Sequence, residues 1–227
     1  MPKLTWHGHA CFVLEHGGKR IIFDPFLTGN PKADVAAAQL PPLDGILLTH
    51  GHADHLGDAV PLAKRFQATV VAPYELALYC QDQGAPHVHP MHIGGAHDFP
   101  FGRVKLVVAI HGGQVEAEGG ERFTTFPCGF LVTMGGKTVY HAGDTALTMD
   151  MQLLEGRVDV MLVPIGDNFT MGLEDAARAV AFVKPKVAIP MHWGTFPDIE
   201  TDPETFQQAV GKEATVVVLQ PGNTYDF

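Results

Sequence analysis

The segment His50-Gly51-His52-Ala53-Asp54-His55 constrains this chain more than any other, because it places four metal-binding side chains within six residues. Imidazoles and a carboxylate are ligands that suit Zn, Mn, Fe or Ni. The segment follows an apolar run, so we expect a buried strand to end where the histidines begin. In an extended segment His50 and His52 point the same way and can reach one ion, whereas Asp54 and His55 lie beyond the turn and can serve a second. A histidine-rich surface loop would explain neither the preceding strand nor matching ligands elsewhere.

Three other segments follow the same order of an apolar strand, one ligand-type residue and small neighbours. They end at His111, after Val107-Val108-Ala109-Ile110, at Asp144, after Thr138-Val139-Tyr140-His141-Ala142-Gly143, and at His192, after Val187-Ala188-Ile189-Pro190-Met191. Strand ends meet at one edge of a sheet, so ligands that are distant in the sequence can converge there. The sequence therefore predicts one metal centre whose ligands come from the ends of several strands.

The remaining pattern alternates groups of short strands with a few helices. Apolar or β-branched runs predict strands over Leu4–His7, Cys11–Leu14, Arg20–Phe23, Gly45–Leu48, Thr69–Ala72, Val104–Ile110, Phe130–Thr133, Thr138–His141, Val158–Val163, Val187–Pro190 and Thr215–Leu219. Helical spacing or capping residues predict helices over Leu56–Phe66, Pro73–Asp82, Leu173–Ala181 and Pro203–Val210, and long loops over Ala33–Leu43 and Val115–Pro127. This order indicates mixed sheets with helices outside, in a single domain over residues 1–227.

Composition excludes some classes of function. The formal net charge is −10 and no dense Lys/Arg run occurs, which argues against a nucleic-acid partner. The three cysteines are far apart and indicate no disulfide framework. No stretch approaches the ~20 apolar residues of a membrane span, and the first residues lack a signal-peptide pattern. We therefore expect a cytoplasmic protein with no membrane partner.

These motifs resemble the metallo-β-lactamase superfamily, and further stretches resemble its family of uncharacterised metal-dependent hydrolases, close to the L-ascorbate-6-phosphate lactonase branch. The stretches are Trp6-His7-Gly8-His9-Ala10, Asp24-Pro25-Phe26, Tyr140-His141-Ala142-Gly143-Asp144-Thr145, Pro164-Ile165-Gly166, Phe169-Thr170-Met171-Gly172 and Pro190-Met191-His192-Trp193-Gly194-Thr195-Phe196-Pro197. The resemblance implies an α/β fold, a four-layer αββα sandwich of two mixed β-sheets with helices on both outer faces.

The resemblance also implies the ligand roles. Metal 1 would be held by His50, His52 and His111, metal 2 by Asp54, His55 and His192, and Asp144 would bridge them. Two divalent transition-metal ions are then expected, zinc first, with manganese, nickel or iron as alternatives. A hydroxide shared by the two ions would cleave a small ester, lactone or phosphodiester, with Asp54 and Asp144 as catalytic carboxylates.

Three further residues have two interpretations each. His9 is a candidate catalytic proton donor or substrate contact, or else a structural histidine. Asp24 is a candidate for orienting a ligand without touching a metal, or else a turn residue before Pro25. His141 is interpreted in the same way, as a residue that orients ligands or packs in the core. His7 is interpreted as structural.

Other functions remain as alternatives. A metal-dependent nuclease or phosphodiesterase would use the same ligands, but the acidic balance argues against it. A non-catalytic metal-binding protein is a different class, which the complete ligand set disfavours. The expected partner is a small-molecule substrate, and a homo-oligomer is suggested only by the lactonase resemblance.

Overall fold

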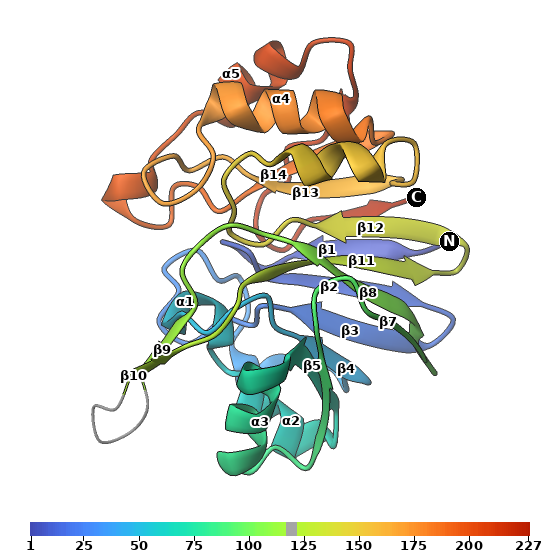
Figure 1. Cartoon of the computed structure of the whole chain (residues 1–227), viewed down its shortest axis with the longest axis vertical. Helices are drawn as coiled ribbons and strands as arrows, with labels where there is room; N and C mark the ends of the chain where they lie inside the picture. The colour runs from blue at the N-terminus through green and yellow to red at the C-terminus, as the bar shows by residue number, and fades with distance from the viewer. Residues whose placement is uncertain (117–121) are drawn as a thin grey trace.

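Two seven-stranded sheets face each other in the computed structural model, which describes residues 1–116 and 122–227 (Figure 1). The first sheet has the order β16-β1-β2-β3-β4-β5-β6, with β1 (Lys3–Trp6), β2 (Phe12–His16), β3 (Lys19–Phe23), β4 (Gly45–Leu47), β5 (Thr69–Pro73), β6 (His87–Met91) and β16 (Thr224–Asp226). The second has the order β15-β14-β13-β12-β11-β8-β7, with β7 (Ala96–Phe99), β8 (Gly102–Val108), β11 (Cys128–Met134), β12 (Lys137–His141), β13 (Val160–Pro164), β14 (Val187–Met191) and β15 (Thr215–Val216). Both sheets mix parallel and antiparallel pairs, as the sequence predicts.

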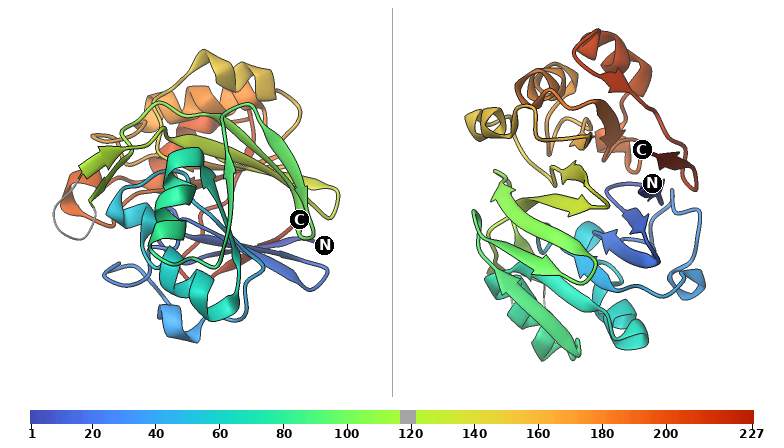
Figure 2. Two further views of the ribbon diagram at one scale, coloured as in Figure 1. Left: turned by 60° about the horizontal axis from the view of Figure 1, so that its bottom comes forward. Right: turned by 90° about the vertical axis from the view of Figure 1, so that its right-hand side faces the viewer.

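Helices cover the outer face of each sheet. They are α1 (Ala53–Leu56), α2 (Ala59–Phe66), α3 (Tyr74–Asp82), α4 (Leu173–Val183) and α5 (Pro203–Val210), with short 3₁₀ turns η1 (Ala37–Gln39), η2 (Met149–Leu154) and η3 (Pro197–Ile199). Figures 1 and 2 show α2 and α3 beyond the first sheet, and α4 and α5 beyond the second. The predicted four-layer sandwich of the metallo-β-lactamase type is confirmed. Within the described residues, no helix has both the length and the apolar character needed to cross a bilayer.

Three apolar clusters hold the layers together. The central cluster lies between the two sheets and includes Phe12, Phe23 and Phe130, all fully buried. A second cluster packs the first sheet against α2 and α3, and a third packs the second sheet against α4, α5 and η2. Each buried large side chain contributes about 1.5–3 kcal/mol, so the core fixes how the sheets lie relative to each other.

Three local predictions need correction. The helix predicted over Leu56–Phe66 begins at Ala59 as α2, because Gly57 takes a φ of +40° and Leu56 is the last residue of the separate helix α1. The predicted strands do not include the edge strands β6 and β7, because the polar side chains of His87, His89 and His97 hide the apolar pattern there. The predicted loop Val115–Pro127 contains a small hairpin, β9 (Gln114–Glu116) and β10 (Arg122–Thr124); its residues 117–121 lie outside the described part of the chain.

Gly57 determines where α1 ends, and substitution of this residue tests that role. A Cβ at Gly57 would overlap the Pro25 carbonyl oxygen, whereas a Cβ at Gly136, also at positive φ, would meet nothing within 4 Å. We expect Gly136→Ala to lower the free energy of unfolding by about 1 kcal/mol through backbone strain alone. Gly57→Ala should lower it by about 3 kcal/mol or more, because the backbone must also shift. Urea unfolding of both variants measures the difference, and equal losses would contradict it.

Candidate metal centre

The carboxylate of Asp144, just after β12, lies at the centre of the predicted ligands. Its Oδ2 atom is 2.9 Å from His192 Nε2, 3.3 Å from His55 Nε2, 3.5 Å from His111 Nε2 and 4.0 Å from His50 Nε2. His50 and His55 come from the first sheet's loops, and His111 and His192 follow β8 and β14 of the second. Four imidazoles from three segments of the chain therefore converge on one oxygen.

The donor atoms fall into two overlapping regions around Asp144. His50, His52 and His111 form one group of donor atoms within 4.8 Å of one another, and their ring centroids are 4.6 to 5.1 Å apart. A second group comprises His9, Asp54, His55 and His192, and a third, of His50, His55 and Asp144, shares members with both. The residues predicted to hold two ions are therefore together in space, and their assignment to particular ions remains a prediction.

Several buried atoms in this cluster have no hydrogen-bond partner. Among the described residues they include His55 Nε2, Asp144 Oδ1 and both ring nitrogens of His192. The His192 Nε2 atom is 2.9 Å from Asp144 Oδ2, yet the two groups lack hydrogen-bond geometry. A buried polar atom without a partner costs about 1–3 kcal/mol. The lone pairs of these nitrogen and oxygen atoms converge without forming hydrogen bonds. Such an arrangement suits a divalent cation, which would be coordinated by them.

Asp24 holds the segment that contains His50 and His55 in place through hydrogen bonds. Its fully buried carboxylate accepts hydrogen bonds from the Thr49 amide (2.8 Å) and hydroxyl (2.6 Å), and its Oδ2 is 2.8 Å from His55 Nδ1. The Thr49 hydroxyl is also 2.9 Å from His50 Nδ1. A proton on Nδ1 leaves Nε2 free to face a metal. Thr49 received no role from the sequence; its position directly before His50 was the available signal.

The His9 side chain has no contact with solvent, which a residue that binds substrate would need. It is fully buried, with Nε2 3.1 Å from Asp54 Oδ2 and Nδ1 2.9 Å from the Thr195 hydroxyl. Its donor atom also belongs to the group that contains Asp54, His55 and His192, which sequence reasoning did not anticipate. This geometry favours a residue that fixes Asp54.

His141 lies outside those groups of donor atoms. Its Nε2 is 2.9 Å from the Ala10 carbonyl oxygen, and its Nδ1 accepts a 3.1 Å bond from the Gly143 amide. Both bonds are satisfied by one neutral tautomer, with the proton on Nε2. His141 therefore supports the backbone turn that carries Asp144.

Burial and mutual charge set the protonation of the centre. Burial lowers the pKa of His9 to about 4, and burial with the neighbouring His55 lowers the pKa of His50 well below its usual value. Burial alone would raise the pKa of Asp144, but His192 and His55 hold it well below its usual range. Burial alone would lower the pKa of His55, but Asp144 and Asp24 hold it well above. Since a proton on His55 would then balance two carboxylates, a divalent ion could replace that proton.

The backbone is strained at three of these positions. His9, Asp24 and His192 have φ values of +54°, +40° and +55°, a left-handed conformation that non-glycine residues rarely adopt. The His192 amide donates a 3.1 Å hydrogen bond to the His9 carbonyl oxygen, so two of these residues support each other across the sheets. Such strain is held by the surrounding structure and concentrates at functional sites.

Known proteins share both sequence and fold with this chain. Residues 3–192 match the β-lactamase superfamily domain. A UPF0173 metal-dependent hydrolase from Heliobacterium modesticaldum is 48% identical, with 99% of this chain and 97% of that protein aligned. Another from Bacillus cytotoxicus is 50% identical, with 98% of each chain aligned. A metallo hydrolase, Igni18 from Ignicoccus hospitalis, has a TM-score of 0.88 and 33% identity over 100% of this chain and 99% of its own.

We expect about two transition-metal ions per chain from this ligand set. His52→Ala and His192→Ala remove donors from two different groups and should each lower metal content. His97→Ala is the matched control, because His97 is exposed on β7 and outside the donor groups. Elemental analysis of protein purified without added metal measures this, and parental metal content in both variants would contradict the ligand assignment.

Asp24→Asn should lower metal affinity about 10–100-fold, because the amide cannot accept the same hydrogen bonds from Thr49 and His55. Asp34→Asn is a close control: Asp34 Oδ1 is likewise 2.8 Å from a histidine Nδ1, that of His7, which is not a predicted ligand. Titration of the metal-free proteins with zinc compares the two. Equal effects of the two substitutions would show that Asp24 has no special role.

Proposed function

Since the chain belongs to the UPF0173 family of metal-dependent hydrolases, within the β-lactamase superfamily, we propose that it hydrolyses a small ester, lactone or phosphodiester at the Asp144 centre. The observation that carries this proposal is the convergence of four imidazoles on Asp144 Oδ2.

We assign the centre two divalent ions, zinc first, held by His50, His52, His111, Asp144, Asp54, His55 and His192. Ions bound there would lower the pKa of water towards ~7 and polarise the oxygen under attack. Manganese, nickel and iron suit the same ligands, since nitrogen and oxygen donors do not discriminate strongly among them.

The chain's own residues prepare this chemistry. Asp144 is held ionised by His192 and His55, so it offers a full negative charge between the two ligand groups. Although burial alone would raise the pKa of Asp54, a hydrogen bond with His9 lowers it below its usual range. Asp54 therefore stays ionised, as a metal ligand must be, while the hydrogen bond with His9 fixes its orientation. Of the interpretations that the sequence left open for His9, we therefore propose the structural one, in which His9 positions Asp54.

The substrate would approach over the least buried ligands. His52, Asp54 and His111 are half-buried, whereas His50, His55 and His192 are buried. Aromatic rings border the other side: Phe26 and Phe196 each have ring centroids 5.8 Å from that of His9. An apolar group on the substrate would pack there.

The two alternative functions have less support. The net charge of −10 disfavours a polynucleotide substrate, which a nuclease would need. A non-catalytic metal-binding protein would not need ligands that a substrate can reach, next to the aromatic rings of Phe26 and Phe196. A cytoplasmic setting and a homo-oligomer remain predictions.

The proposal is tested with p-nitrophenyl acetate, γ-butyrolactone and bis-p-nitrophenyl phosphate, each with and without a chelator. We expect at least one to be hydrolysed, with loss of activity in chelator and recovery on added zinc. Asp144→Asn preserves shape but removes the charge and should lower kcat/KM by more than ~100-fold, beyond the effect of losing a residue that only orients a ligand. Asp34→Asn should retain parental activity. Full activity of Asp144→Asn with parental metal content would refute this role of Asp144.

A further inference from the structure

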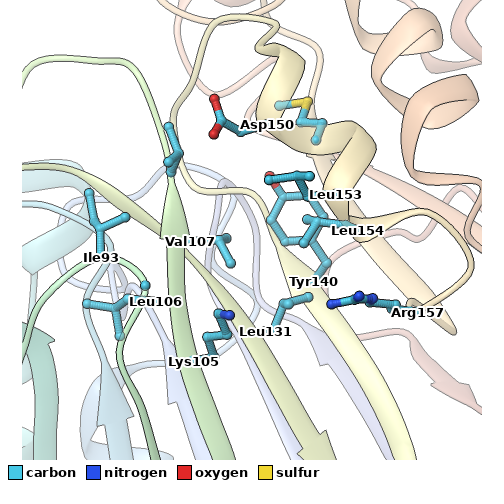
Figure 3. A pocket seen from close by; sticks show the side chains of 13 residues that line it. Ile93, Lys105, Leu106, Val107, Leu131, Tyr140, Asp150, Leu153, Leu154 and Arg157 are labelled. Carbon is cyan, nitrogen blue, oxygen red and sulfur yellow. The ribbon is translucent and has the colours of Figure 1, made fainter.

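A pocket of about 360 Å³ lies on the outer face of the second sheet, away from the metal centre (Figure 3). It is bordered by β8, β11, β12 and η2, and none of the predicted metal ligands lines it. Its volume is in the range of small-molecule sites. The walls are largely apolar and include Val107, Leu131 and Leu153, the last 69% exposed.

Strand register explains how the floor is built. Leu131 on β11 pairs with Lys105 on β8 on one side and with Tyr140 on β12 on the other. Paired residues in a sheet point to the same face, so these three side chains form one row across the pocket. The neighbouring Leu106 and Val132 belong to the core between the sheets, which confirms that the row faces outward.

Two cations lie at one end of the pocket without an ion pair. Lys105 and Arg157 both line it, and neither has a carboxylate partner among the described residues. Figure 3 shows them on either side of Leu131, while Asp150 lies at the opposite end. In a chain with a net charge of −10, two unpaired cations beside an apolar surface favour an anionic, amphipathic ligand.

Tyr140 provides a second, independent indication that this pocket binds a ligand. Its side chain is fully buried, yet its hydroxyl has no hydrogen-bond partner. The hydroxyl is directed toward the end of the pocket where Asp150 lies (Figure 3). Burial also raises the pKa of Tyr140, so the group remains a hydrogen-bond donor. A buried donor that lines a pocket without a partner is expected to meet an acceptor on a ligand.

We propose that this pocket binds a small amphipathic monoanion. Its carboxylate lies over Leu131 between Lys105 and Arg157, and its aliphatic body lies against Val107 and Leu153. A hydroxyl at the far end accepts from Tyr140 and donates to Asp150. A second copy of this chain fits less well, because a flat protein surface would leave the Tyr140 hydroxyl unpartnered.

The probes are 8-hydroxyoctanoate, octanoate and 1-octanol, added to methyl-labelled protein and followed by nuclear magnetic resonance. We expect the methyl signals of Val107, Leu131 and Leu153 to shift, with the affinity order hydroxyoctanoate, octanoate, octanol. Lys105→Gln and Arg157→Gln should each weaken binding of the two carboxylates about fivefold while leaving octanol unchanged. Lys212→Gln, an equal charge change near α5, is the control.

Two further variants locate the interactions. Tyr140→Phe should abolish the preference for hydroxyoctanoate over octanoate without lowering the melting temperature, because the hydroxyl makes no bond within the protein. His52→Ala should leave the affinity unchanged, since the metal centre does not line the pocket.

Three results would overturn the proposal. They are the absence of methyl shifts at millimolar probe, shifts confined to residues near His52, and shifts that depend on protein concentration rather than on probe. The last result would assign the face to contact between two copies of the chain.

Discussion

The buried carboxylate of Asp24 is the interaction on which the rest of the site depends. A carboxylate without solvent is tolerable only when its oxygens are fully used, and here one amide, one hydroxyl and one imidazole use them. Because those groups belong to Thr49 and His55, the loop after β4 cannot move independently of the loop after β3. The ligand residues of the first sheet are thereby fixed before any metal arrives, which reduces the entropy lost on binding.

The centre spans the boundary between the two sheets. The first sheet carries the cluster from His50 to His55, and the second carries His111, Asp144 and His192. Their separation is therefore determined by the apolar layer between the sheets, in which Phe23 and Phe130 meet with ring centroids 6.3 Å apart. Bound ions would in turn link the two halves, so metal affinity and stability of the fold are coupled.

Sequence reasoning identified the side chains that cluster around Asp144 because a buried strand followed by histidine or aspartate is a local pattern. It identified the central strands of both sheets for the same reason. It could not find β6 and β7, whose polar edge positions lack apolar alternation. It also could not assign partners: that His9 contacts Asp54 and Thr195, which are 45 and 186 residues away, follows only from the packed fold.

The left-handed backbone at His9, Asp24 and His192 has a consequence for how this protein could be improved. Asp24 and His9 use their side chains in hydrogen bonds, so replacing them would cost more than the backbone gains. The ring nitrogens of His192 have no hydrogen-bond partner in the described chain, and glycine or asparagine adopts the left-handed conformation more readily, so selection for thermal resistance alone would favour replacing His192. If His192 is a metal ligand, such a selection would trade metal binding for stability, and directed evolution of the protein must select for both properties together.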